Sequence, residues 1–209
     1  MTATTDTLEH VYNAEGAQAI RESYETWAAG YDADNIGNGF RLPSIGAAFA
    51  SRYVSPGGGA ILDAGCGTGL VGEALAILGY QDIVGLDISP AMIKHAEMLQ
   101  TYSRLYEHDL GQPIPEKDNS FEAVTCFGSL GPGHAPKNCL DEFVRVTRPG
   151  GHVIFNVRPD TYVEQGLRAK IDGLIAGRTV REVEQSQDFR PFLLAEPNLG
   201  AKIFVLEVS

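Results

Sequence analysis

The sequence contains few basic residues. Lysine and arginine together account for 16 of its 209 residues, against 27 aspartates and glutamates, so the formal net charge is −11 at pH 7. Affinity for nucleic acids depends largely on clustered basic side chains. The deficit argues against a nucleic-acid-binding surface, and we expect no nucleic-acid partner.

Long apolar runs and paired cysteines are also missing. Every apolar run is far shorter than the roughly 20 residues that a membrane-spanning helix needs. The first ten residues, MTATTDTLEH, have neither the basic start nor the apolar stretch of a secretory signal peptide. Cys66, Cys126 and Cys139 are widely spaced and form no C-x-x-C pair. We therefore expect a cytoplasmic protein with no membrane attachment, no disulfide framework and no metal.

Short apolar segments and amphipathic segments alternate through the middle of the chain. Strands are expected at 60–64, 82–86, 103–107, 121–127 and 152–156, with helices at 70–78, 90–100 and 137–146 between them. Ser89 and Pro90 are a suitable N-cap and first residue for the second of these helices. This alternation is typical of an α/β fold with a parallel sheet.

The two ends of the chain follow other patterns. Residues 15 to 29 predict a helix that ends at Gly30, and a second helix follows Pro43. After the alternation, residues 162–176 predict a helix whose apolar face is made by Val163, Leu167, Ile171, Leu174 and Ile175. Two extended segments follow, at 179–194 and 201–208.

These elements together predict the fold. We expect a Rossmann-like, doubly wound sheet of seven strands, mostly parallel with an antiparallel C-terminal edge strand. No linker divides the chain, so we interpret residues 1–209 as a single domain. Residues 1–55 would form a helical lid, 56–158 a cofactor-binding core, and 159–209 a terminal helix and strand pair.

A glycine-rich turn follows the first strand of the alternation. The stretch LDAGCGTGLVG, residues 62–72, contains four glycines, and its second half fits the dinucleotide-binding pattern G-x-G-x-x-G. Glycine lets a ligand approach the backbone closely, and open α/β sheets bind ligands beyond the carboxyl ends of their strands. A tight turn alone needs fewer glycines, so we predict a cofactor site here.

Asp63, at the start of this turn, argues against a diphosphate ligand. Two like charges about 4 Å apart repel each other by about 4 kcal/mol at an effective dielectric near 20. S-adenosylmethionine (SAM) has an ammonium group, a sulfonium group and no phosphate. We therefore favour SAM, with its carboxylate on the glycine amides and its ammonium facing Asp63, directly or through water.

Two more aspartates stand at the ends of the next two strands. Asp87 ends the segment IVGLD and is a candidate acceptor for both ribose hydroxyls, with Ile88 beside it as an apolar surface for adenine. Asp109 and the backbone amide of Leu110 are candidates for the adenine amino group and a ring nitrogen. Each aspartate alone could be a helix cap, but three at successive strand ends favour a nucleoside site.

These segments resemble the motifs of class I SAM-dependent methyltransferases. Residues 63–69 are similar to the first motif of that family, 85–92 to the second and 108–110 to the third. More narrowly, WAAGYD at 27–32 and GSLGPG at 128–133 resemble the Williams–Beuren-region methyltransferase-like proteins. The resemblance implies methyl transfer from SAM, with S-adenosylhomocysteine (SAH) as the product.

The resemblance also implies particular contacts with SAM. The implied residues are Gly65 and Gly67 at the methionine part, Phe127 and Gly128 near the methionine chain and the reacting methyl, and Tyr31 as a cover. Arg41 is a candidate partner of the SAM carboxylate and Met92 a candidate neighbour of adenine, with a surface arginine and a core methionine as the alternatives. Tyr24 and Trp27 are expected as core or lid residues rather than ligands.

His134, in the loop after the fourth expected strand, is the candidate general base. Histidine side chains titrate near neutral pH, so His134 could take a proton from the methyl acceptor; an exposed loop histidine is the alternative. The chain lacks the [DN]-P-P-[YF] segment of enzymes that methylate adenine or glutamine nitrogen. We therefore expect a small-molecule acceptor, methylated on oxygen, nitrogen or sulfur.

Other functions stay open at this point. A non-catalytic SAM-binding protein would carry the same cofactor motifs. A nicotinamide-dependent oxidoreductase is disfavoured by Asp63 and by the lack of a Y-x-x-x-K pair. A protein or RNA methyltransferase is disfavoured by the acidic net charge.

Overall fold

A computed structural model describes residues 16–131, 134–160 and 162–209, and the first fifteen residues of the expected lid lie outside it. Seven strands form one sheet in the order β3-β2-β1-β4-β5-β7-β6. Their bounds are β1 Ile61–Ala64, β2 Ile83–Asp87, β3 Arg104–Glu107, β4 Phe121–Cys126, β5 Thr147–Val157, β6 Val180–Gln185 and β7 Lys202–Val208. The division into lid, core and C-terminal pair stays a prediction.

The strand directions confirm the predicted fold class. Strands β1 to β5 pair in parallel, whereas β7 is antiparallel to both of its neighbours, β5 and β6. The antiparallel C-terminal strand lies one place in from the edge, which β6 occupies. From β1 the chain first winds outward through β2 and β3, then returns to β4 on the other side of β1. Ligands of open α/β sheets bind at such a switch point.

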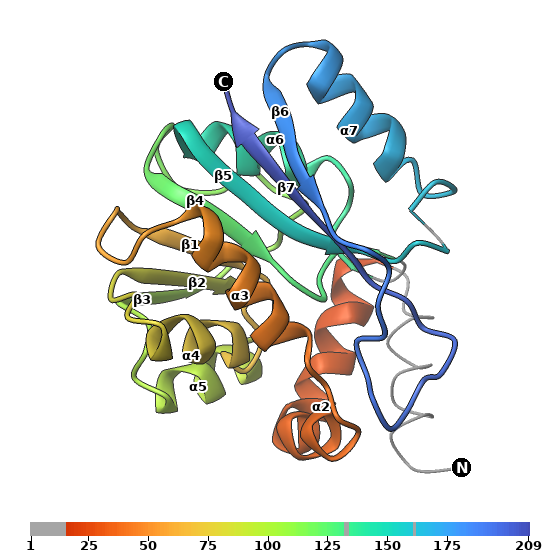
Figure 1. Cartoon of the computed structure of the whole chain (residues 1–209). Helices are drawn as coiled ribbons and strands as arrows, with labels where there is room; N and C mark the ends of the chain where they lie inside the picture. Colours follow the sequence, from red (N-terminus) through yellow and green to blue (C-terminus); the bar gives the residue numbers. More distant parts are fainter. Residues whose placement is uncertain (1–15, 132–133, 161) are drawn as a thin grey trace.

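Six described helices accompany the sheet: α2 Ala17–Gly37, α3 Leu42–Tyr53, α4 Leu70–Ile77, α5 Pro90–Met98, α6 Cys139–Val146 and α7 Leu167–Ala176. Helices α3 and α4 bury their apolar side chains against one face of the sheet, and α6 and α7 against the other. Helix α2 lies at the carboxyl ends of the central strands, beside the segment that joins β6 to β7 (Figure 1). None of the described helices combines the length and the apolar character needed to cross a lipid bilayer.

Burial and capping explain why the central elements form where the sequence predicts them. All five residues of β2 are buried, as expected for a parallel strand covered on both faces. The Ser89 side chain accepts a hydrogen bond from the Met92 amide at 3.3 Å, and Pro90 is the first residue of α5. The predicted start of this helix is confirmed.

The predicted end of the first helix at Gly30 is wrong. Helix α2 continues through Gly30 to Gly37. One glycine inside a helix costs only about 1 kcal/mol. Contacts further along offset this cost, because the Trp27 indole donates to the Asp34 carboxylate at 2.8 Å and the Asn35 amide donates to the Tyr31 carbonyl at 2.8 Å.

Two predicted elements near the C-terminus are also too long. Helix α7 begins at Leu167 rather than at residue 162, after Gly166 in a left-handed conformation (φ 71°). Val163 therefore precedes the helix and is 59% exposed, instead of lying on its buried face. The segment 179–194 forms a regular strand only over β6. Ser186 and Phe189 still bond to the backbone of Ile203 and Ala201, and residues 191–194 then pack beside the loop between α2 and α3.

Candidate cofactor and acceptor site

A cavity of about 530 Å³ opens at the carboxyl ends of the central strands, between the glycine turn and α2. All the predicted site residues except Asp63 and Arg41 line it. They are Tyr31, Gly65, Gly67, Asp87, Ile88, Met92, Asp109, Leu110, Phe127, Gly128 and His134. The sheet topology therefore brings together residues from six separate segments of the chain.

The glycine turn presents its backbone to this cavity. Gly65, Gly67 and Gly69 all have positive φ angles, which residues with a Cβ rarely adopt. A Cβ on Gly65 would lie 2.2 Å from the Ser129 hydroxyl oxygen, and that hydroxyl donates to the Gly65 carbonyl at 3.2 Å. Around Gly67, by contrast, no atom lies within 4 Å of a Cβ position. The turn is thus fixed on one side and open to a ligand on the other.

The last glycine of the G-x-G-x-x-G pattern serves packing, as the third glycine of such a pattern does between helix and strand. A Cβ on Gly72 would lie 2.2 Å from the Tyr102 ring, and one on Gly85 would lie 2.8 Å from it. Tyr102 packs in the space that these glycines leave, and the sequence did not single it out. Gly72 therefore makes room for a tyrosine and does not line the cavity.

Gly72→Ala is expected to lower the free energy of unfolding by about 1–3 kcal/mol, because the added methyl group overpacks the site against Tyr102. Gly173→Ala, with no atom within 4 Å of the new Cβ, is the matched control inside helix α7. We expect the control to stabilise the protein by about 0.5–1 kcal/mol. Urea unfolding followed by the fluorescence of Trp27 measures both; equal effects of the two substitutions would contradict the assignment.

Asp63 does not line the cavity, so of the two expected arrangements the direct contact is not favoured, and a contact through water stays a prediction. Its side chain is 1% exposed, accepting hydrogen bonds from the Tyr102 hydroxyl at 2.7 Å and the Thr125 hydroxyl at 3.1 Å. Burial raises the pKa of Asp63 to about 6, although these hydrogen bonds oppose the shift. Asp63 is a buried charge behind the turn, so any effect on a ligand acts through the backbone, through water or at longer range.

The raised pKa of Asp63 predicts a specific pH dependence of stability. A carboxyl group whose pKa is higher in the folded than in the unfolded protein favours folding at low pH, and this contribution is lost as pH rises from about 4 to about 6. At pH 7.5 the penalty approaches roughly 3 kcal/mol, at 1.36 kcal/mol per pKa unit. Asp63→Asn should therefore become more stable relative to the wild type as pH rises from 4.5 to 7.5, in urea titrations. A relative stability that falls with pH would contradict this reading.

Asp87 keeps a carboxylate on the cavity wall. Its two oxygens accept hydrogen bonds from the Gly67 and Ser89 amides, each at 2.9 Å. Burial raises the pKa of Asp87, and these amides partly oppose the shift. The side chain is therefore held in one orientation at the end of β2, where the ribose was expected.

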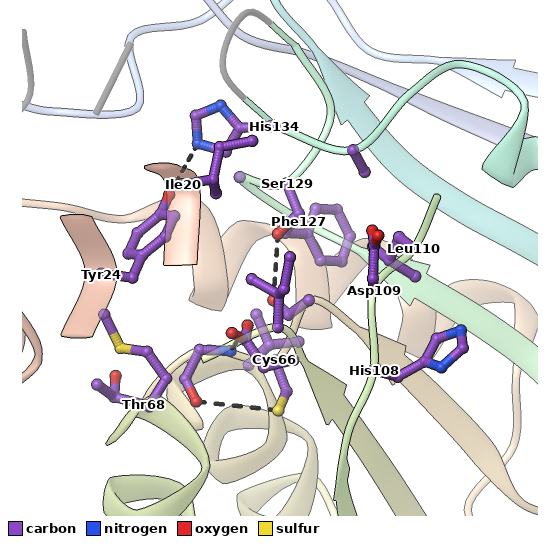
Figure 2. A pocket seen from close by; sticks show the side chains of 18 of the residues that line it. Ile20, Tyr24, Cys66, Thr68, His108, Asp109, Leu110, Phe127, Ser129 and His134 are labelled. Carbon is purple, nitrogen blue, oxygen red and sulfur yellow. Dashed lines mark hydrogen bonds between the residues drawn. The ribbon is translucent and has the colours of Figure 1, made fainter. Parts of the chain in front are cut away.

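Residues expected around adenine line one side of the cavity. Figure 2 shows His108, Asp109 and Leu110 together there, away from His134. Asp109 accepts a hydrogen bond from the Gly111 amide at 2.8 Å. Met92 is 1% exposed and lines the cavity, so it packs in the core and also forms part of the cavity wall.

The opposite side of the cavity holds the candidate base. The Tyr24 hydroxyl and His134 Nε2 form a hydrogen bond of 2.8 Å, and the two side chains face each other in Figure 2. Tyr24 thus lines the cavity, whereas the sequence analysis predicts a core or lid residue. The helical spacing of Tyr24 and Tyr31, two turns apart on one face of α2, is the signal that could have identified it.

Arg41 does not line the cavity, which favours the surface-arginine alternative, and its pairing with the SAM carboxylate stays a prediction. Its Nε donates to the Arg190 carbonyl at 2.8 Å, and its guanidinium lies 5.9 Å from the centre of the Phe189 ring. Arg41 therefore anchors the segment between β6 and β7. No motif in the sequence predicts that this segment reaches the loop between α2 and α3.

The cysteines near the cavity have no catalytic features. Cys66 lines it and Cys126 does not, and burial raises the pKa of both thiols well above the usual value. Within the described ranges no three histidine, cysteine, aspartate or glutamate side chains gather into a group that could hold a metal ion.

The charged groups that line the cavity fit SAM. Among its described lining residues, Asp87 and Asp109 are carboxylates and none is lysine or arginine. A diphosphate would require compensating positive charge, whereas a ligand with a sulfonium and an ammonium does not. The open backbone at Gly67 and the aromatic rings of Tyr24, Tyr31 and Phe127 complete a pocket suited to a cationic nucleoside.

Comparisons with known proteins give the same answer. Residues 62–155 match a family model described as a methyltransferase domain. The chain is 34% identical to human methyltransferase-like protein 27 over 72% of its own length and 64% of that protein. It is 30% identical to the ubiquinone biosynthesis O-methyltransferase of Pseudomonas putida strain W619, over 75% and 68% of the two chains. The chain spans about half to two thirds of the length of the first curated relatives it matches.

A solved structure shares the fold. Magnesium protoporphyrin IX methyltransferase from Synechocystis PCC 6803, with bound SAM, superimposes with a TM-score of 0.61 at 16% identity, over 100% of this chain and 92% of that one. The match to methyltransferase-like protein 27 confirms the narrower resemblance to the Williams–Beuren-region proteins. SAM is therefore the cofactor, and the chain belongs to the class I SAM-dependent methyltransferases.

Proposed function

We propose that this methyltransferase transfers the methyl group to an oxygen atom of a small-molecule acceptor, and that the Tyr24–His134 pair takes the acceptor's proton. The observation that carries the proposal is the 2.8 Å hydrogen bond between these two side chains on the cavity wall. Relatives named for ubiquinone biosynthesis and for malonyl-[acyl-carrier protein] are O-methyltransferases, which supports oxygen as the accepting atom.

For this reaction the protein has to align the acceptor with the methyl group of SAM and to remove the acceptor's proton. SAM supplies a methyl carbon already activated by its sulfonium. A hydroxyl acceptor becomes a good nucleophile when a base removes its proton. Which group donates in the Tyr24–His134 hydrogen bond depends on the histidine tautomer. In the neutral tautomer whose Nε2 accepts from the Tyr24 hydroxyl, the proton path runs through the phenol: Tyr24 passes its proton to Nε2 and takes the proton of the acceptor. Helix α2 covers the site and limits access of water.

The walls of the cavity favour a small acceptor. Aromatic and apolar residues enclose the part near His134, among them Ile20, Tyr31, Phe40 and Phe127. Such walls bury a compact, partly apolar molecule well. The acidic net charge of −11 disfavours RNA.

Incubation with methyl-labelled SAM and a fractionated cell extract tests the proposal. We expect label to enter the small-molecule fraction and to resist removal by acid but not by ether-cleaving reagents, as an O-methyl group does. Label in the protein or RNA fraction would contradict a small-molecule acceptor. Binding of SAH without labelling of any fraction would instead support a non-catalytic SAM-binding protein.

A further inference from the structure

A second, smaller cavity adjoins the cofactor cavity. It has a volume of about 70 Å³ and shares with the larger one the residues Tyr24, Tyr31, Phe40, Gly128 and His134. Its other walls come from the end of β5 and from the segment between β6 and β7, including Phe192. The two cavities thus meet at the Tyr24–His134 pair, where the proposed proton transfer takes place.

Two hydrogen-bond donors from the end of β5 line the smaller cavity. Asn156 is 5% exposed, and its Oδ1 accepts a hydrogen bond from the Gly128 amide at 2.7 Å. This bond identifies the other amide atom, Nδ2, as a donor, and within the described part of the chain Nδ2 has no hydrogen-bond partner. Arg158 lies two residues further on and also lines the cavity.

The two cavities have opposite charge. The described walls of the larger one carry Asp87 and Asp109 but no lysine or arginine. Among its described lining residues, the smaller one carries Arg158 but no aspartate or glutamate. A cationic ligand at one end and an anionic group at the other would both be favoured by this arrangement.

Asp160 shows that the Arg158 guanidinium can hold a carboxylate. Arg158 Nη2 lies 2.8 Å from Asp160 Oδ2, and Arg158 Nε lies 3.3 Å from Oδ1. The Asp160 side chain is 53% exposed and does not line the cavity. Ion pairs with such an exposed partner contribute little to stability. A carboxylate inside the cavity can therefore compete with Asp160 for the same guanidinium nitrogens of Arg158.

We propose that the smaller cavity is an anion subsite for the methyl acceptor, in which Arg158 and Asn156 bind a carboxylate group of that molecule. The volume suits a carboxylate rather than a whole acceptor, so the body of the acceptor lies at the junction, between Tyr24, Tyr31 and His134. The acceptor class is then a small hydroxylated carboxylic acid. This inference rests on the proposed function, since it assigns the acceptor of the same site.

Matched probes that differ only in a carboxylate test the anion subsite. In calorimetric titrations of SAH-saturated protein, 3,4-dihydroxybenzoate is expected to bind about 10-fold or more tightly than catechol, because it gains a charge-assisted hydrogen bond. Arg158→Gln should abolish the preference. Asp160→Asn should increase it, because the competing carboxylate is gone. Arg168→Gln removes a similar exposed ion pair on α7 and should change nothing.

The opposite effects of Arg158→Gln and Asp160→Asn separate ligand binding from a structural role, since loss of a merely structural ion pair would affect both variants alike. Equal binding of the two probes, binding of neither, or a preference that survives Arg158→Gln would overturn the anion subsite. SAH binding is measured in the same samples. Intact SAH binding with no carboxylate preference would remove the subsite and leave the proposed methyl transfer standing, which labelled SAM tests separately.

Discussion

Replacement of Asp87 by asparagine is expected to weaken SAH binding by about 100-fold, because an amide cannot replace the charge-assisted hydrogen bonds of a carboxylate to the ribose hydroxyls. The carboxylate lies on the cavity wall and is oriented by the Gly67 and Ser89 amides. The variant loses the acceptor for one of these two amides but also removes a desolvated charge, since burial raises the pKa of Asp87, and circular dichroism checks that it is folded. The fluorescence of Trp27, which packs against Tyr31 with ring centres 4.6 Å apart, follows the titration.

Asp82 provides the matched control for this variant. It directly precedes the same strand at its opposite end, where it accepts a hydrogen bond from the Ser103 hydroxyl at 2.8 Å. Asp82→Asn should leave the dissociation constant of SAH unchanged. An Asp87→Asn protein that is folded and binds SAH as tightly as the wild type would remove Asp87 from the cofactor site.

Replacement of His134 by glutamine is expected to lower kcat for a phenolic acceptor by about 100-fold, at the lower end of the usual contribution of a general base. SAH affinity should not change, since the Tyr24–His134 pair lies on the side of the cavity away from His108 and Asp109 (Figure 2). Tyr24→Phe interrupts the same proton path, because the phenol stands between the acceptor and His134 Nε2, and we expect a loss of similar size. Steady-state kinetics with labelled SAM and catechol measure these effects.

An acceptor that is already ionised distinguishes a base from a merely positioning residue. With 4-nitrocatechol at alkaline pH no proton has to be removed, so His134→Gln and the wild type should approach the same kcat. His95→Gln, on α5 and outside both cavities, is the control. An equal loss of kcat with both acceptors would assign His134 to positioning instead of proton transfer.

The central fold could be predicted because short-range signals decide it. The apolar segment IVGLD forms a fully buried parallel strand, and Ser89 with Pro90 begins the next helix. The errors arise where tertiary contacts override local preference. Gly30 does not end α2, because Trp27 and Asn35 make contacts on either side of it. The predicted strand does not continue to residue 194, because residues 191–194 bond to the loop after α2 instead of to the sheet.

The placement of Asp87 and Asp109 on one cavity was predictable for a similar reason. Parallel strands bring their carboxyl ends to one edge, so aspartates at successive strand ends meet even when they are far apart in sequence. The burial of Asp63 was not predictable, because it depends on Tyr102, a residue with no motif of its own. Likewise, Tyr24 and Arg158 reach the cavities from α2 and from the end of β5, and only the three-dimensional structure places them together.

The central claim is that the cavity at the glycine turn binds a phosphate-free, cationic nucleoside. Calorimetric titration of the apoprotein with SAH and, separately, with NADH tests it most directly. The account predicts saturable heat from SAH with one site per chain and none from NADH. Saturable heat from NADH, with none from SAH in a folded sample, would contradict it.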